Sequence, residues 1–274
     1  MKQKDAEEII ALHHQWLQLP LNLRSKSPGQ ARFEKATFSG LSFNRVDLSF
    51  ARFYRCDFTG CDFNGANLTG ATMLYCCFDD AKLNKANLAG SALKTSSFKR
   101  ASLLEANLAG AQLKSADLTA ALLKRACLKD ADISAADFTQ ARGVGIDLSG
   151  VTAKKTLFMG AIFDEATIEG ASFVECDLPE ASLQDATLGR SEFYLCELAG
   201  LQLHGSTLRD LIFAGCQPGD LKAQKVKVVK SETEPVASEL AAVLSGKIAD
   251  FKWPTDKKYG WRAGHSAIRW SHGI

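Results

Sequence analysis

A strict five-residue period runs from residue 31 to residue 215 without an insertion or a deletion. Its unit reads Ala-(Asp or Asn)-Leu-x-x, as at residues 66–68. The large apolar residue, here called the centre, falls on every residue number from 33 to 213 that ends in 3 or 8. Of these 37 centres, 18 are Leu, 14 are Phe, two are Ile and one is Met, and only Gly143 and Ala153 depart from the pattern.

A period of five fits neither an α-helix, whose apolar stripe recurs every 3.6 residues, nor a flat strand, whose faces alternate every two. The backbone must instead turn a corner every five residues, so that four corners close a square coil of 20 residues. The centre and the small residue two before it then point inward. Coils of this kind stack like parallel strands about 4.8 Å apart. The 37 repeats predict an all-β quadrilateral solenoid of about nine coils.

On these repeats, which cover about two thirds of its length, the chain resembles the pentapeptide-repeat family. The resemblance implies a right-handed quadrilateral β-helix. The family includes quinolone-resistance proteins that imitate duplex DNA and bind DNA gyrase, secreted bacterial effectors, and many members with no assigned role. A helix followed by repeats also resembles the opening of phage and prophage members of the family.

Three segments are predicted: an N-terminal capping helix and linker at 1–30, the repeats at 31–215, and a C-terminal cap or docking tail at 216–274. Residues 5–18 predict an amphipathic helix that covers the open end of the first coil, with Asp5 as N-cap and Pro20 ending it. Ile9, Leu12 and Trp16 share its apolar face, and His13 and His14 are expected at the surface or rim.

Beyond the repeats, the Gln-Pro-Gly-Asp sequence at 217–220 is expected to break the period. Residues 224–229 predict a strand able to add to the last coil, and 237–244 predict a short helix. The tail is rich in aromatic and basic residues, and its candidate partner-binding residues are Trp253, Tyr259, Trp261, Arg262 and Trp270. It is interpreted either as a cap laid on the rod or as a docking segment for a protein, nucleic acid or membrane surface.

Six of the eight cysteines fall at the small inward position, namely Cys56, Cys61, Cys76, Cys176, Cys196 and Cys216. We expect free thiols that act as small apolar residues in a reducing compartment, because Cβ atoms one coil apart are slightly too distant for an unstrained disulfide. Cys77 and Cys127 lie one position before a centre and are expected to be more accessible.

The two departures at Gly143 and Ala153 leave room for two interpretations. Loss of two large centres predicts either a bend, bulge or partner-binding dent, or a degenerate coil that the fold tolerates.

One outward column, in which successive members are 20 or 40 residues apart, carries aromatic ends and a basic middle. Such a face is a candidate protein-binding surface. Its candidate residues, with two neighbours, are Tyr54, Leu74, Tyr75, Lys94, Lys114, Tyr194 and Leu195.

Charge divides the rod into two parts. Residues 31–160 hold 17 Lys and Arg against 12 Asp and Glu, a net of +5, whereas residues 161–215 hold two against ten, a net of −8. The acidic part could present a DNA-like face to a gyrase or topoisomerase, although the basic part would be repelled by a DNA-binding channel. The residues proposed for this acidic face are Asp164, Glu165, Glu169, Glu175, Glu180 and Asp185.

No catalytic, cofactor-binding or metal-binding arrangement is predicted, because the sequence has no nucleophile elbow, phosphate loop or metal-ligand spacing. The chain has neither an apolar run that would span a bilayer nor the features of a signal peptide, so we expect a soluble cytoplasmic protein. The main hypothesis is a non-enzymatic module that binds a protein partner through a rod face and the tail. A gyrase-binding DNA mimic that protects against quinolones or toxins is the alternative, and a secreted bacterial effector is the third.

Overall fold

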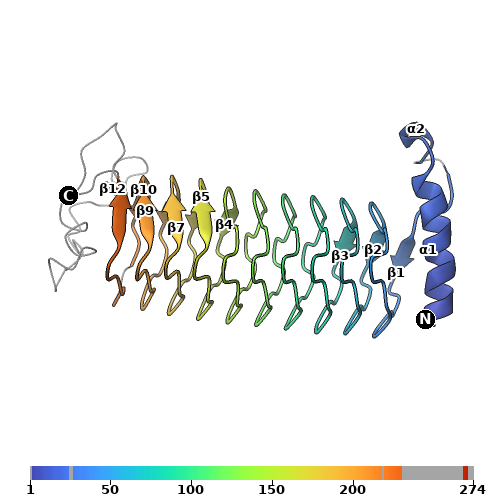
Figure 1. Cartoon of the computed structure of the whole chain (residues 1–274), viewed down its shortest axis with the longest axis horizontal. Coiled ribbons are helices and arrows are strands. Elements are labelled where there is room, and N and C mark those ends of the chain that lie inside the picture. The colour runs from blue at the N-terminus through green and yellow to red at the C-terminus, as the bar shows by residue number, and fades with distance from the viewer. Residues whose placement is uncertain (1, 25–26, 218, 230–267, 271–274) are drawn as a thin grey trace.

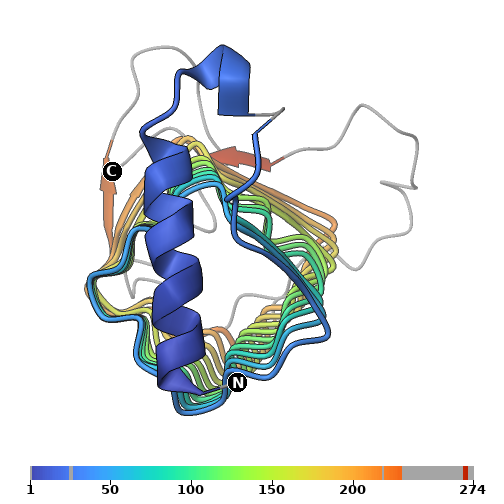
Figure 2. The same ribbon diagram turned by 90° about the vertical axis from the view of Figure 1, so that its right-hand side faces the viewer.

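The computed structural model describes residues 2–24, 27–217, 219–229 and 268–270. Two helices, α1 (Gln3–Leu17) and α2 (Leu21–Arg24), precede a stack of parallel coils. Figure 1 shows the coils forming a straight rod, and Figure 2 shows α1 lying across the first of them. The predicted β-solenoid is therefore confirmed.

Paired residues of neighbouring coils are 20 positions apart along the chain. Phe33 is opposite Phe53 in a parallel pair of strands, and isolated bridges such as Asn67 to Asn87 carry the same register through the rod. Short strands form three sheets. The first contains β1 (Arg32–Glu34), β2 (Arg52–Tyr54) and β3 (Thr72–Leu74). The second contains β4 (Thr152–Lys154), β6 (Ser172–Val174), β8 (Glu192–Tyr194), β10 (Leu211–Ala214) and β12 (Ile268–Trp270). The third contains β5 (Thr167–Glu169), β7 (Thr187–Gly189), β9 (Thr207–Arg209) and β11 (Lys227–Val229).

The corners explain why the unit has five residues. Every residue from 35 to 215 whose number ends in 0 or 5 has a positive φ, and 24 of these 37 residues are not glycine. At most corners the N–H of the small residue donates to the C=O of the preceding centre, as from Ala66 to Phe63 at 3.0 Å. The Asp or Asn before a centre accepts a backbone N–H two residues on, as Asp57 Oδ1 does from Thr59 at 2.9 Å. These carboxylates are turn formers.

At the strand-forming corners the turn hydrogen bond is absent, and at most of them a side chain from the next coil takes its place. The carbonyls of Phe33, Phe53 and Met73 accept hydrogen bonds from residues that lie 23 positions later. The donors are Cys56 Sγ at 3.7 Å, Cys76 Sγ at 3.7 Å and Ser96 Oγ at 2.7 Å. The inward thiols therefore fill space, as predicted, and also satisfy buried carbonyls.

The interior is a set of stacked apolar columns. Phe38, Phe58, Phe78 and Phe98 stack with successive ring centroids 4.8, 4.9 and 4.9 Å apart. At Gly143 the space is already occupied, because an added Cβ would lie 3.0 Å from Phe163 Cδ1 and 3.2 Å from Ile146 Cδ1. The register of 20 continues on both sides of Gly143 and Ala153. The structure thus supports a tolerated degenerate coil at this position.

Helix α1 differs from its predicted form in three respects. It begins at Gln3, and Asp5 is its third residue, where the Asp5 carboxylate accepts the backbone N–H of Lys2 at 3.1 Å. Leu12 is 53% exposed, so the predicted apolar face is wrong there. The buried residues of α1 are Ala6, His13 and Trp16. The prediction that His13 lies at the surface is therefore also wrong.

Side chains of α1 take the place of a preceding coil. The Gln3 amide both donates to and accepts from the backbone of Ser42, at 3.0 Å in each direction. His13 Nε2 lies 3.1 Å from the Ser49 carbonyl, while His13 Nδ1 accepts the Ala31 N–H at 3.1 Å. His14 Nε2 lies 3.1 Å from the Asp47 carbonyl. The predicted cap therefore works through hydrogen bonds to the coil edge as well as through apolar contact.

The coil register continues past Gly215. Gln217 pairs with Glu197 and Lys222 pairs with Gln202, so the prediction that the period breaks at 217–220 is wrong. Strand β11 pairs in parallel with β9, as predicted for the strand near 224–229. Strand β12 pairs antiparallel with β10. The helix predicted at 237–244 lies outside the described residues.

His13 makes the cap sensitive to pH. Burial lowers the pKa of His13 below its ordinary value of 6.5, outweighing the Ser49 carbonyl and the Asp47 charge, which raise it, while His14 and Arg24 lower it further. The folded protein thus binds fewer protons than the unfolded chain, and its stabilisation by neutral His13 is complete above about pH 6.5 and declines as the pH falls below that value. Protonation would also turn Nδ1 into a donor facing the Ala31 N–H.

We therefore expect the hydrogen-exchange protection of residues 3–17, corrected for intrinsic rates, to fall between about pH 7.5 and about pH 5.5. His13→Gln should destabilise the cap at the higher pH by about 1–3 kcal/mol, because buried partners lose their bonds. The same variant should lose the pH response across this window. A pH response of equal size in His13→Gln would contradict the assignment to this imidazole.

The structure predicts how many cysteine thiols react in the folded protein. All eight cysteines are free, and only Cys77 and Cys127 are not buried. Burial raises the pKa of Cys61 to about 11, which further suppresses its reactive thiolate. Brief N-ethylmaleimide treatment of the native protein, read by mass spectrometry, should label Cys77 and Cys127 alone. The double variant Cys77→Ser, Cys127→Ser should stay unlabelled until it is unfolded.

Candidate interaction surface

The residues predicted to share one outward column do so. Tyr54 is opposite Leu74 in the β2–β3 register, and Val174 is opposite Tyr194 in the β6–β8 register. Lys94 and Lys114 between them are exposed, and Tyr54, Leu74, Tyr194 and Leu195 are half-buried. We call this side of the rod, whose centres include Phe33, Phe53 and Met73, the Tyr54 face.

At the N-terminal end of this face two tyrosines and an arginine form a cluster. The rings of Tyr54 and Tyr75 meet edge to face, with centroids 5.5 Å apart. The Arg55 guanidinium lies 5.2 Å from the Tyr54 centroid and 5.8 Å from the Tyr75 centroid. These are attractive cation–π distances. Tyr75 remains 44% exposed, so the cluster is accessible.

More cations surround the cluster. Arg32 and Arg52 are opposite one another in the β1–β2 register, and both are exposed. Lys35 precedes Arg55 by one coil and lies 3.7 Å from its neighbour Glu34. On this patch four cations face one carboxylate, a net of +3. We name it the basic-aromatic patch, and it consists of Arg32, Glu34, Lys35, Arg52, Tyr54, Arg55, Leu74 and Tyr75.

The cationic members of this patch were missed by sequence reasoning. The signal was present, because Arg55 stands next to Tyr54 and 20 residues before Tyr75. Two residues with that spacing are neighbours on adjacent coils. The column that contains Arg55 and Tyr75 lies beside the column of Tyr54 and Leu74. Reading both columns together would have revealed the cations of the patch.

The structure does not bring the whole predicted surface together. Tyr194 and Leu195 lie seven coils from Tyr54, which corresponds to about 34 Å along the rod. Lys154, in the same column, lies 4.0 Å from Glu175. The candidate column therefore separates into the basic-aromatic patch and a distant aromatic end.

The acidic residues also do not form one free face. Glu169 binds Arg190 at 3.2 Å and Arg209 at 2.8 Å, and Glu175 lies 3.4 Å from Lys155. The Asp164 carboxylate accepts the Ser182 hydroxyl and, at 3.1 Å, the Gln184 N–H. Among the residues that the structure describes, only three of the six are exposed and free of ion pairs, namely Glu165, Glu180 and Asp185.

The predicted tail residues fall into two groups. Trp253, Tyr259, Trp261 and Arg262 lie outside the described residues. Trp270 belongs to β12, whose backbone pairs it with Leu211.

Two further properties concern the described residues alone. They contain no group of three or more His, Cys, Asp or Glu side chains placed to hold a metal ion. None of the described helices combines the length and the apolar character needed to cross a bilayer.

Comparison with known proteins gives a consistent family relationship. A family model described as a pentapeptide repeat region matches residues 29–108 and 51–126. A second, described as pentapeptide repeats in eight copies, matches residues 144–178 and 171–210. No curated protein sequence matches the chain.

Solved structures of low sequence identity share the repeat. The chain is similar to full-length QnrB1, a plasmid-mediated fluoroquinolone resistance protein, at 19% identity over 65% of this chain and 93% of that one, with a TM-score of 0.46. It is also similar to HetL, a pentapeptide repeat protein involved in heterocyst differentiation regulation from the cyanobacterium Nostoc sp. strain PCC 7120. That match has 18% identity over 78% of this chain and 97% of HetL, with a TM-score of 0.24.

The family models together span residues 29–126 and 144–210, which is more than half of the sequence. They coincide with the coils that the structure builds from five-residue units. The chain belongs to the pentapeptide-repeat family.

Proposed function

We propose that this protein is a non-enzymatic interaction module that binds an acidic surface of a protein partner through the basic-aromatic patch. The observation that carries the proposal is the Tyr54–Arg55–Tyr75 cluster, exposed and ringed by further cations. Arginine and tyrosine are the residue types that most often dominate the binding energy of protein interfaces.

The rod favours binding because its surface is rigid before a partner arrives. Tyr54 and Arg52 extend from a strand hydrogen-bonded on both sides, to β1 and to β3. Little conformational entropy is therefore lost when the patch is covered, which leaves more of the contact energy as affinity. The net charge of the patch adds attraction for an acidic partner and predicts binding that weakens as salt rises.

The tail is proposed as a second contact to the same partner. Its residues Trp253, Tyr259, Trp261, Arg262 and Trp270 share the aromatic and basic character of the patch. Two linked contacts would raise the overall affinity above that of either alone.

A second candidate function is the DNA-mimicking gyrase or topoisomerase binder. It is favoured by the net charge of −8 over residues 161–215 and would parallel the fluoroquinolone resistance ascribed to QnrB1. The pairing of Glu169 and Glu175 with cations weighs against it. Inhibition of gyrase supercoiling at about micromolar protein would support this candidate, and no inhibition there would exclude it.

Charge reversal at the patch tests the main proposal. Full-length protein serves as bait in an extract of its native cells, and the captured partner is then purified and titrated. We expect Arg52→Glu, Arg55→Glu to abolish capture and Tyr75→Ala to weaken affinity by about thirtyfold, equivalent to about 2 kcal/mol at a hot spot. The substituted residues are exposed or half-buried surface groups, so thermal stability should be almost unchanged.

The matched control is Lys124→Glu, Arg125→Glu, which changes net charge equally at two exposed residues on another side of the rod. This control should keep the partner. Equal loss of partner capture in both double variants would show that overall charge alone explains the binding, and would overturn the proposal. Trp261→Ala with Arg262→Glu tests the tail separately.

A further inference from the structure

Helix α1 does not pair every backbone group of the first coil edge, and one such stretch lies between Ser42 and Asp47. Between the first and second coils, the Arg45 N–H donates to the Asn64 carbonyl and the Asn67 N–H donates to the Val46 carbonyl, both at 2.9 Å. The equivalent groups of the first coil are the Asn44 carbonyl and the Asp47 N–H. Neither has a hydrogen-bond partner within the part of the chain that the structure describes. Gln3 and His14 pair the coil edge on either side of this stretch.

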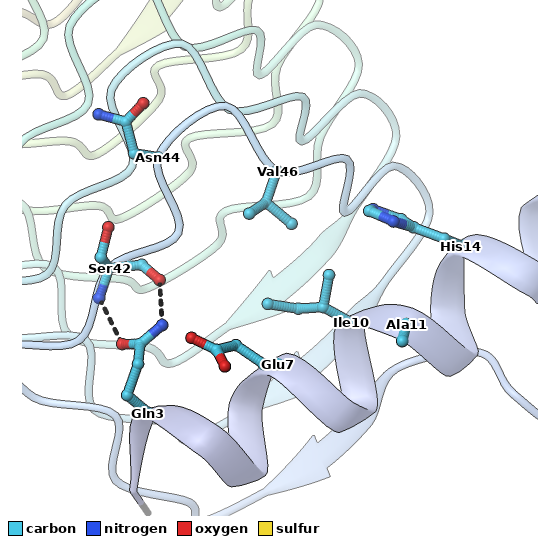
Figure 3. A pocket seen from close by; sticks show the side chains of 8 residues that line it. All are labelled: Gln3, Glu7, Ile10, Ala11, His14, Ser42, Asn44 and Val46. Carbon is cyan, nitrogen blue, oxygen red and sulfur yellow. Dashed lines mark hydrogen bonds between the residues drawn. The ribbon is translucent and has the colours of Figure 1, made fainter.

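A groove of about 360 Å³ lies over the same stretch, between α1 and the first coil. Figure 3 shows Ile10 of α1 reaching toward Val46 of the coil, with Glu7 and the Gln3–Ser42 hydrogen bonds beside them. Ile10 and Val46 are partly buried and pack against the core, whereas Ala11 is exposed at the helix side. The volume is at the lower end of the range for specific ligand sites.

The coil register defines what would fit. A ligand residue must offer its N–H to Asn44, and the residue after it must offer its carbonyl to Asp47. In the coils, the first of these residues sits at a corner with positive φ, as Arg45 does at 55° and Gly65 at 65°. The second is small and apolar and points inward, as Val46 and Ala66 do. Glycine adopts the first conformation at least cost.

We propose that this groove binds a turn of a partner protein that presents Gly followed by Ala or Val. The glycine N–H would donate to the Asn44 carbonyl, and the carbonyl of the next residue would accept the Asp47 N–H. Its small side chain would contact Val46 and Ile10. The partner thus adds one corner of a coil to the open edge, a short form of strand addition. This site is independent of the basic-aromatic patch.

The test uses the full-length protein labelled with ¹⁵N and two blocked tetrapeptides of identical composition, Asn-Gly-Val-Asp and Asn-Val-Gly-Asp. Titration with the first should shift the Asp47 amide resonance and saturate at about millimolar concentration. The second should bind at least about tenfold more weakly, because valine strongly disfavours a positive φ. Equal shifts with both peptides, or no shift up to about 10 mM, would overturn the proposal.

A protein variant locates the site. Ala11→Phe places a ring in the groove and should remove the response of Asp47 to the first peptide. Leu12→Ala, at the neighbouring residue that is 53% exposed and does not line the groove, should retain it. The amide resonances of α1 in the same spectra report whether the helix stays docked. A response that persists in a docked Ala11→Phe protein would place binding elsewhere and overturn the assignment.

Discussion

Backbone hydrogen bonding between consecutive coils is the constraint on which the whole structure depends. Each coil donates to and accepts from the coil 20 residues away, so the register set at one position is imposed on the next. A corner is required every five residues, and 24 non-glycine residues accept a positive φ to make one. Each such residue costs about 1–2 kcal/mol in isolation, which the bonds between coils and the buried columns offset.

The need of each buried carbonyl for a hydrogen-bond donor also explains why the inward residue differs between corners. Where a corner keeps its internal hydrogen bond, the inward residue of the next coil, 23 positions after the centre, is mostly Ala. At strand-forming corners such as those of Phe53 and Phe173, the freed carbonyl receives the thiol of Cys76 or Cys196. Cysteine and serine at the inward position are therefore compatible with this second kind of corner, where alanine would leave a buried carbonyl without a donor. The strand-forming corner of Leu188 is an exception, because the residue 23 positions later is Leu211, which has no side-chain donor. Hydrogen bonding does not explain this residue.

Periodicity predicted the coil, its inward columns and the free thiols, because those features repeat in sequence as they repeat in space. The contacts that escaped prediction do not repeat. His13 is buried because one imidazole meets both Ser49 and Ala31, which a helical pattern cannot encode. The basic-aromatic patch was half predicted, since Arg55 belongs to a neighbouring column. The continued coil at Gln217 was missed because its Pro and Gly suggested a break.

This division also indicates where function can reside on such a rod. Inward side chains are buried in the core. Backbone groups between coils form hydrogen bonds with one another. A regular coil therefore offers a partner only its outward side chains. The basic-aromatic patch uses that freedom at Arg52, Tyr54 and Tyr75. The coil ends are different, because backbone groups there lack a neighbouring coil and must find other partners. At the first coil, helix α1 supplies partners for backbone groups of Ser42, Ser49 and Asp47 through Gln3, His13 and His14. The Asn44 carbonyl and the Asp47 N–H lie on this edge and have no partner among the described residues, so a partner could be recognised there by its backbone. The coil geometry already specifies the shape that such a partner must have.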